Sequence, residues 1–228
     1  MRLIAHRGFD DQYSANTIAA VERAVPRADA IELDVRRCKS GELVVAHDEI
    51  LEIAIDGIDR VEDLTAAELA DLDAHDGEGI QTLDVVLEAI PADVDVNFEL
   101  KESTIIDDAL EIAEDAPNHV IVSSFDAETI DATSERDSGV SLAYILDATP
   151  TDDLAFAAEI DCAYVHPHTS ICLLTDVVSQ AHEAGMEVNA WTVDSRAAAW
   201  ALEKRGVDGV IASSPSVLEA ESEESSAE

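Results

Sequence analysis

The sequence predicts an α/β protein in which eight parallel strands close into a barrel and helices cover the outer face. Short runs of Val, Ile and Leu alternate with segments of helical periodicity along most of the 228 residues. Most of these runs consist largely of apolar residues, which is typical of parallel strands that are buried on both faces. Polar and charged side chains collect where these runs end, and parallel barrels carry their chemistry at such ends. The chain length suits one domain of this kind.

The predicted strands are nine short apolar runs, one of which is an extra hairpin strand at 43–47. The full set is 3–6, 30–36, 43–47, 94–100, 120–123, 141–145, 163–165, 187–191 and 208–212. A doubly wound open sheet is the rival arrangement. That fold usually has a glycine-rich phosphate loop after its first strand, and none follows the first strand here. We therefore predict the closed barrel.

Helices are predicted between the strands, at 17–25, 83–90, 105–115, 127–136, 152–159, 174–185 and 196–205. Thr17 and Asp126 precede helical segments and are suitable N-caps, because their side-chain oxygens can accept hydrogen bonds from the first turn. Gly185 and Gly206 stand where helices are expected to end. The segment 49–82 falls outside the alternation, and we predict a loop insertion with one short helix near 65–73.

The strongly negative charge of the chain limits its partners. Asp and Glu number 51 against 13 Lys and Arg, which gives a net charge of −38. Such a surface repels nucleic acid and anionic membranes, so we expect neither as a partner and a small molecule as the substrate. The surface also repels itself at low salt, which indicates a halophilic source.

Several further properties follow from composition. No apolar stretch approaches the ~20 residues of a membrane span, and no signal-peptide pattern follows the first residue, so we expect a cytoplasmic protein. Cys38, Cys162 and Cys172 are too few and too irregularly spaced for a disulfide framework or a zinc site, and we expect reduced, mostly buried thiols. We expect one domain over 1–218 and an acidic, disordered tail over 219–228.

Three carboxylates stand on two predicted strands and suggest a metal site. Glu32 and Asp34 are two residues apart on one strand, so their side chains point to the same face. With Glu99 from a neighbouring strand, they offer oxygen ligands to a hard cation such as Mg²⁺ or Ca²⁺. The alternative is a solvated strand end whose acids point apart. The apolar neighbours of Glu32 and Asp34 favour the ligand pair.

Two histidines and two cations stand at other strand ends. His6 and His47 each end an apolar run, and an imidazole can transfer protons near neutral pH. The two could therefore act as general acid and base on opposite sides of a phosphorus, although each taken singly is more often a structural histidine or a metal ligand. Arg7 offers a planar donor fork for phosphate and Lys101 a compact charge. Either could also form a salt bridge to a neighbouring acid.

The other histidines divide by position. We assign His75, His119 and His182 no functional role, because they lie in predicted loops or on helices. His166 and His168 follow the strand at 163–165. A place at the mouth of the site and a structural role remain equally open for these two.

The ordered set of strand-end motifs resembles the glycerophosphodiester phosphodiesterase family. The motifs are His6-Arg7-Gly8, Asn16-Thr17, Glu32-Leu33-Asp34-Val35, 41–48, Asn97-Phe98-Glu99-Leu100-Lys101, 122–126, His166-Pro167-His168, 190–194 and 206–211. They occur in the family's order from residue 3 to about residue 215. One motif alone would be weak evidence, whereas the ordered set is highly specific.

The resemblance implies a TIM (β/α)8 barrel that uses a divalent metal, Mg²⁺ or Ca²⁺, to hydrolyse glycerophosphodiesters to glycerol phosphate and an alcohol. By this resemblance His6 and His47 are the acid–base pair, Glu32, Asp34 and Glu99 are metal ligands, Arg7 and Lys101 bind phosphate, and Phe125 and Trp191 line the pocket near the glycerol end. Which histidine is the acid and which the base stays open.

The sequence departs from the family pattern in three places. Ala15 stands where the family usually has a glutamate before Asn-Thr. Ser213 and its neighbours replace a common Thr-Asp before a proline, which removes a second carboxylate. The insertion after His47 is shorter than is usual in the family. None of these departures removes a proposed ligand or catalytic histidine, so they bear on substrate preference and turnover.

Two other functions are kept as alternatives. A phospholipase D- or C-like phosphodiesterase on the same barrel would call for an apolar, membrane-seeking loop, and the insertion at 49–82 is acidic. A non-catalytic metabolite-binding barrel is expected to have lost His6, His47 or Glu99, and all three are present. We therefore predict the glycerophosphodiester hydrolase.

Overall fold

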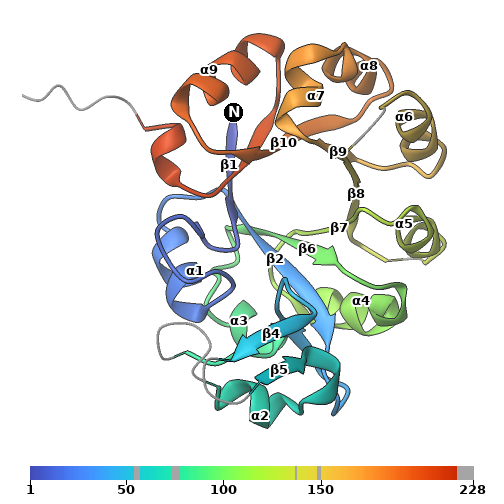
Figure 1. The fold of residues 1–228 in the computed structure, drawn as a ribbon. Helices are drawn as coiled ribbons and strands as arrows, with labels where there is room; N and C mark the ends of the chain where they lie inside the picture. Colours follow the sequence, from blue (N-terminus) through green and yellow to red (C-terminus); the bar gives the residue numbers. More distant parts are fainter. Residues whose placement is uncertain (54–56, 73–77, 137, 148–149, 220–228) are drawn as a thin grey trace, which may run out of the picture.

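The structure is a closed parallel barrel, as predicted. The computed structural model describes residues 1–53, 57–72, 78–136, 138–147 and 150–219. Figure 1 looks along the barrel and shows the strands enclosed by helices. The barrel strands are β1 (Arg2–His6), β2 (Ala30–Arg37), β6 (Asp95–Leu100), β7 (Val120–Ser124), β8 (Ser141–Leu146), β9 (Tyr164–Pro167), β10 (Glu187–Val193) and β11 (Gly209–Ala212). Neighbours in the order β1-β11-β10-β9-β8-β7-β6-β2 pair in parallel, and β1 also pairs with β2, which closes the barrel.

The outer helices alternate with the strands. They are α1 (Ile18–Ala24), α3 (Leu83–Leu87), α4 (Ile106–Asp115), α5 (Ala127–Ser134), α6 (Pro150–Glu159), α7 (Thr169–Leu174), α8 (Val177–Glu183) and α9 (Arg196–Arg205). The predicted caps are confirmed, and Gly185 directly follows the C-cap of α8 with a left-handed φ of 86°. The side chains of Thr17 and Asp126 accept hydrogen bonds from the first turns of α1 and α5, and Gly206 ends α9 in a left-handed conformation.

The prediction of one continuous helix over 174–185 was wrong. The segment contains the last residue of α7 and all of α8, separated at Thr175 and Asp176. Thr175 has an extended backbone, and its hydroxyl donates to the carbonyl of Ile171 and accepts from the amide of Val177. A threonine side chain can thus replace backbone hydrogen bonds and end one helix where the next begins. Helix α7 itself, which starts at Thr169, was not predicted.

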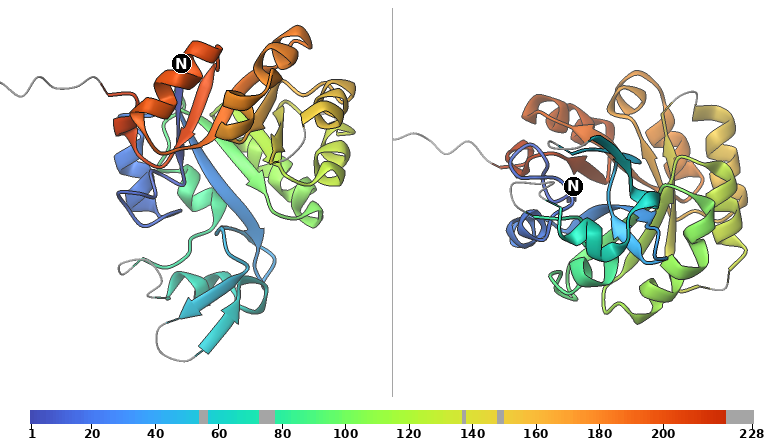
Figure 2. Two further views of the ribbon diagram at one scale, coloured as in Figure 1. Left: turned by 45° about the horizontal axis from the view of Figure 1, so that its top comes forward. Right: turned by 60° about the horizontal axis from the view of Figure 1, so that its bottom comes forward.

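The insertion after β2 has more regular structure than predicted. Strand β3 (Leu43–Val45) pairs antiparallel with β2, as expected of the extra hairpin strand. The segment 49–82 was predicted as a loop with one helix, but it contains the hairpin β4 (Ile50–Ile53) and β5 (Gly57–Arg60), the 3-10 turn η1 (Val61–Asp63) and helix α2 (Ala66–Ala70). The left view of Figure 2 shows this unit below the barrel, beyond the end of β2.

The insertion is held by its own small core. Its buried side chains are Cys38, Val44, Ala46, Val61, Leu69 and Ile80. Thr65 and Glu68 form a reciprocal capping box at the start of α2. Such caps and apolar contacts stabilise a short helix that would be marginal by itself. The insertion is therefore a packed unit at the edge of the barrel mouth.

Other composition-based expectations can be compared with the described residues. Cys38, Cys162 and Cys172 are buried and free, as predicted. No helix in the described part of the chain is long and apolar enough to cross a membrane. Glu219 forms an ion pair with Arg27, while the rest of the predicted tail, 220–228, and His75 lie outside the described residues.

Candidate functional site

The carboxyl ends of the barrel strands surround one pocket. Parallel strands direct these ends to the same face of a barrel, so side chains far apart in the sequence meet there. The cavity measures about 140 Å³. It is lined by His6, Arg7, Glu32, His47, Asn97, Glu99, Lys101, Phe125, Ile145, His166, Trp191, Thr192 and Ile211. The lining includes eight of the nine predicted site residues, and the ninth, Asp34, is fully buried and bonded to two of them.

The three carboxylates of Glu32, Asp34 and Glu99 form a buried cluster. Glu32 and Asp34 lie on β2, and Asp34 is level with Glu99 on the neighbouring strand β6. Each residue offers an oxygen atom, and these atoms lie within 4.8 Å of one another. Burial and the charge of Asp34 raise the pKa of Glu32 to about 8. Burial and the neighbouring carboxylate therefore oppose ionisation of Glu32 unless a further positive charge joins the cluster.

The donor set fits a hard divalent cation. All three groups are carboxylates, which Mg²⁺ and Ca²⁺ prefer as ligands. Oε1 of Glu32 is buried and has no hydrogen-bond partner among the described residues. A buried acceptor without a partner is costly to a folded protein, and a cation would satisfy it. The cluster could therefore hold a metal, with Glu32 as its most available ligand.

Arg7 and Lys101 bring two positive charges to the cluster. Nε of Arg7 lies 2.8 Å from Oδ2 of Asp34, and Nζ of Lys101 lies 2.6 Å from Oδ1 of the same carboxylate. Lys101 also forms an ion pair with Glu99. Burial opposes ionisation of Asp34, but the charges of Lys101 and Arg7 hold the pKa of its carboxyl below the usual range. Both cations line the pocket while they form salt bridges, so the two predicted roles are compatible.

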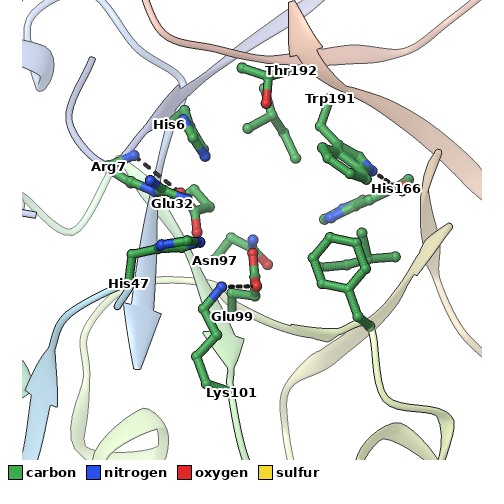
Figure 3. A pocket seen from close by; sticks show the side chains of 13 residues that line it. His6, Arg7, Glu32, His47, Asn97, Glu99, Lys101, His166, Trp191 and Thr192 are labelled. Atoms are coloured by element: carbon green, nitrogen blue, oxygen red, sulfur yellow. Dashed lines mark hydrogen bonds and ion pairs between the residues drawn. The ribbon is translucent and has the colours of Figure 1, made fainter. Parts of the chain in front are cut away.

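The two predicted histidines lie on the same side of the pocket as Glu32, and Figure 3 shows both rings directed into it. His6 ends β1, and its Nδ1 lies 3.0 Å from a carboxylate oxygen of Asp10. His47 follows β3, and its Nδ1 lies 2.8 Å from Oδ1 of Asp48. Burial opposes protonation of His6, but the nearby carboxylates of Asp10 and Glu32 raise its pKa above the ordinary value.

The opposite side of the pocket is aromatic. The rings of Phe125 and Trp191 meet edge to face with their centroids 5.2 Å apart. Trp191 donates its indole N–H to the carbonyl of His166 over 2.7 Å, and its ring also meets that of His168. His166 lines the pocket, whereas His168 is the N-cap of α7. The two histidines that were left open therefore have different positions.

Asn97 and Thr192 line the pocket but were not predicted as site residues. Asn97 is buried, and its Oδ1 has no hydrogen-bond partner in the described part of the chain. It stands two residues before Glu99 on β6, and strand alternation alone would have placed both side chains on one face. Thr192 follows Trp191 on β10, so the same rule would have placed it on the other face. A shift in register between β10 and β11 at this point explains why both can reach the pocket.

The buried His166 should make stability depend on pH. Burial lowers the pKa of His166 to about 3, and its Nε2 lies 3.2 Å from the side-chain nitrogen of Asn189. Below pH ~6.5 the unfolded chain binds a proton here that the folded chain excludes, so the wild type loses stability as the pH falls to about 3. We expect His166→Gln to flatten this slope by about 1.4 kcal/mol per pH unit in urea titrations. Parallel curves for the two proteins would contradict a neutral, buried His166.

Comparison with known proteins gives consistent results. The model of the glycerophosphoryl diester phosphodiesterase family matches residues 6–217. A glycerophosphodiester phosphodiesterase of Caldanaerobacter subterraneus subsp. tengcongensis is 32% identical over 232 residues, with 95% of each chain covered. A probable glycerophosphodiester phosphodiesterase of Mycobacterium tuberculosis is 30% identical, with 91% of this chain and 85% of the relative covered.

Solved structures show the same architecture. A phosphodiesterase of Oleispira antarctica in complex with the product sn-glycerol-3-phosphate superposes with a TM-score of 0.87 at 27% identity, with 95% of each chain covered. A glycerophosphodiester phosphodiesterase of Thermotoga maritima superposes with a TM-score of 0.83 at 29% identity, with 94% of this chain and 95% of that chain covered.

Proposed function

Because the chain belongs to the glycerophosphoryl diester phosphodiesterase family, we propose that it hydrolyses glycerophosphodiesters to glycerol phosphate and an alcohol with the help of a divalent metal. The observation that carries this proposal is the meeting of three carboxylates, two cations and two histidines in one pocket. Each of these groups has a task in the hydrolysis of a phosphate diester. The small-molecule product bound in the Oleispira antarctica relative supports a substrate of this class.

The two histidines supply the proton transfers. One takes a proton from the attacking hydroxyl group, either of water or of the substrate's own glycerol, as its oxygen bonds to phosphorus, and the other gives a proton to the leaving alcohol oxygen as its bond to phosphorus breaks. Attack by the glycerol hydroxyl gives a cyclic phosphate, which water then opens. One water molecule is consumed in the net reaction, which leaves glycerol phosphate and the free alcohol. His6 and His47 suit this pair because both rings face the pocket near Glu32, Arg7 and Lys101.

The charged groups stabilise the phosphate. Arg7 and Lys101 are in place to bind its non-bridging oxygens, whose negative charge grows in the transition state. Glu32, Asp34 and Glu99 would hold the metal, Mg²⁺ or Ca²⁺, which when bound supplies further positive charge to the same oxygens. The carboxylates also keep Lys101 protonated: burial lowers its pKa, but Asp34 and Glu99 raise it beyond the ordinary value.

We assign the aromatic side of the pocket to the organic part of the substrate. Trp191 lies across the pocket from the charged groups in Figure 3, and the ring of Phe125, which also lines the pocket, packs against it to form an apolar wall. Phe125→Ala should raise KM about 10-fold, since it removes one ring of the wall. The value of kcat should stay within about twofold, because Phe125 does not face the phosphate in this assignment.

Leu174→Ala is the matched control for the aromatic wall. Leu174 is a large exposed apolar side chain that does not line the pocket. Its removal should leave KM unchanged in the same steady-state assay. Equal KM values for wild type and Phe125→Ala would show that the substrate does not use this wall.

The proposed function is tested by product identification. The full chain is incubated with glycerophosphocholine or glycerophosphoethanolamine and Mg²⁺ or Ca²⁺ in molar KCl, because a net charge of −38 requires screening. We expect glycerol phosphate and the free amino alcohol in equal amounts. Release of phosphocholine would indicate a phospholipase C-like cleavage instead, and a folded protein that releases neither product would support the non-catalytic barrel.

A further inference from the structure

The chain leaves β1 through an unusual left-handed turn. Arg7, Gly8 and Phe9 follow one another with φ angles of 53°, 78° and 69°. Residues other than glycine disfavour this backbone region because their Cβ atom clashes there. Consecutive residues therefore rarely adopt it without support from their surroundings. The turn begins directly at His6, one of the two histidines that face the pocket. Its conformation therefore decides what lies against that histidine.

Tertiary contacts hold the turn in place. Phe9 is fully buried in the main core, and the amides of Phe9 and Asp10 both donate to the carbonyl of His6. A Cβ atom at Gly8 would lie only 2.8 Å from Cβ of Ala20, so the turn also packs closely on α1. These contacts fold the chain back on itself. As a result, the side chain of Asp10 returns to the ring of His6.

Asp10 contacts the histidine on the nitrogen that faces away from the pocket. Its Oδ2 lies 3.0 Å from Nδ1 of His6, and the two side chains are only 20% and 16% exposed. The hydroxyl of Ser213 donates to the same carboxylate, and the amide of Asp11 donates to the carbonyl of Ser213. Asp10 is therefore held from both sides, by the turn and by the segment after β11.

We propose that Asp10 is a positioning residue for His6. Its carboxylate accepts the Nδ1 hydrogen, and this fixes the tautomer in which Nε2 has no hydrogen and presents its lone pair to the pocket. The same contact restrains rotation of the ring. The role of Asp10 in turnover rests on the proposed function, whereas its effect on the tautomer of His6 does not. The left-handed turn then brings this carboxylate to the ring of His6.

Asp10→Ala tests the kinetic consequence, and Asp11→Ala is its matched control. Both changes remove one carboxylate from the same segment. The side chain of Asp11 is exposed, and its backbone amide, which donates to the carbonyl of Ser213, is kept in the variant. We expect Asp10→Ala to lower kcat about 10- to 100-fold with KM nearly unchanged, as for other residues that orient a reacting group. Asp11→Ala should match the wild type. Equal kcat values for the two variants would overturn the proposal.

The second readout does not depend on turnover. Nitrogen-15 NMR of the His6 ring, assigned by comparison with His6→Gln, reports which nitrogen carries the hydrogen. We expect the Nδ1–H tautomer in the wild type and in Asp11→Ala, and its loss in Asp10→Ala. The same tautomer in all three proteins would overturn the proposal.

Two further controls keep the test decisive. If Asp10→Ala does not fold, Asp10→Asn preserves the side-chain volume, and the same fall in kcat is expected. A wild type that hydrolyses no glycerophosphodiester would contradict the proposed function, while the NMR measurement would still decide whether Asp10 sets the tautomer.

Discussion

His6→Ala and His47→Ala should each lower kcat by about 10³-fold or more, because each removes a proton-transfer group from one step of the hydrolysis. Neither change should unfold the protein in molar salt. His47 is 43% exposed, and His6 is at the end of β1, where the neighbouring strands keep their backbone pairing. Steady-state kinetics with glycerophosphocholine and far-UV circular dichroism measure the two expectations together.

The control for these two variants is His119→Ala. His119 directly precedes β7, at the opposite end of the barrel, where it pairs with Asp95 and Ser141. Its loss should leave kcat within about twofold of the wild type. If either pocket variant keeps wild-type activity, that histidine is not part of the mechanism. If both lose activity through unfolding, the assignment of proton transfer would have no support from this experiment.

Glu99→Gln should raise the metal concentration needed for half-maximal activity by at least about 10-fold, because it removes one anionic ligand from the cluster. The amide has nearly the same volume as the carboxylate, and Glu99 is buried at the end of β6. The change therefore tests charge and ligation more than packing. The effect is measured by recording kcat at increasing concentrations of Mg²⁺ and, separately, of Ca²⁺.

Glu102→Gln provides the matched control for the metal ligand. Glu102 lies three residues further along the same segment, accepts a hydrogen bond from the amide of Arg37 and does not line the pocket. It loses the same charge, so a general electrostatic effect would appear in both variants. A metal titration of Glu99→Gln that coincides with that of Glu102→Gln would remove Glu99 from the ligand set.

The barrel was predictable because its strands depend on local pattern. Runs such as that around Ile4 in β1 or Ile121 in β7 are apolar on both faces, and a parallel sheet covered by helices buries both. The hairpin of β4 and β5 was missed because its strands have four residues each and belong to a small core formed by distant residues such as Cys38 and Ile80. Tertiary contacts of that kind leave no periodic signal.

The charged part of the site followed from one geometric rule, whereas Phe125 and Trp191 were expected from the family resemblance. Parallel strands bring their carboxyl ends to one face, so residues as distant as His6 and Lys101 could be placed in one pocket. Asp10 could not be predicted, because its approach to His6 depends on a left-handed turn that the buried Phe9 supports. Short-range propensity disfavours that turn, and only the folded core supplies its support.

One departure from the family pattern has a visible structural setting. Ser213 stands where a carboxylate is common, and here its hydroxyl donates to the carboxylate of Asp10. The structure thus places an acid beside His6 although position 213 does not provide it. The departure at Ser213 therefore gives a reason to test the effect of Asp10 on turnover.

The most direct test of the central claim is the reversible loss of turnover on metal removal. The full chain is assayed with glycerophosphocholine in molar KCl, treated with a chelator, and then supplied with excess Mg²⁺ or Ca²⁺. We predict that glycerol phosphate release stops in chelator and returns with the metal, because the site formed by the carboxylates of Glu32, Asp34 and Glu99 is then occupied again. Undiminished release in the presence of chelator would contradict a metal-dependent phosphodiesterase built on this cluster.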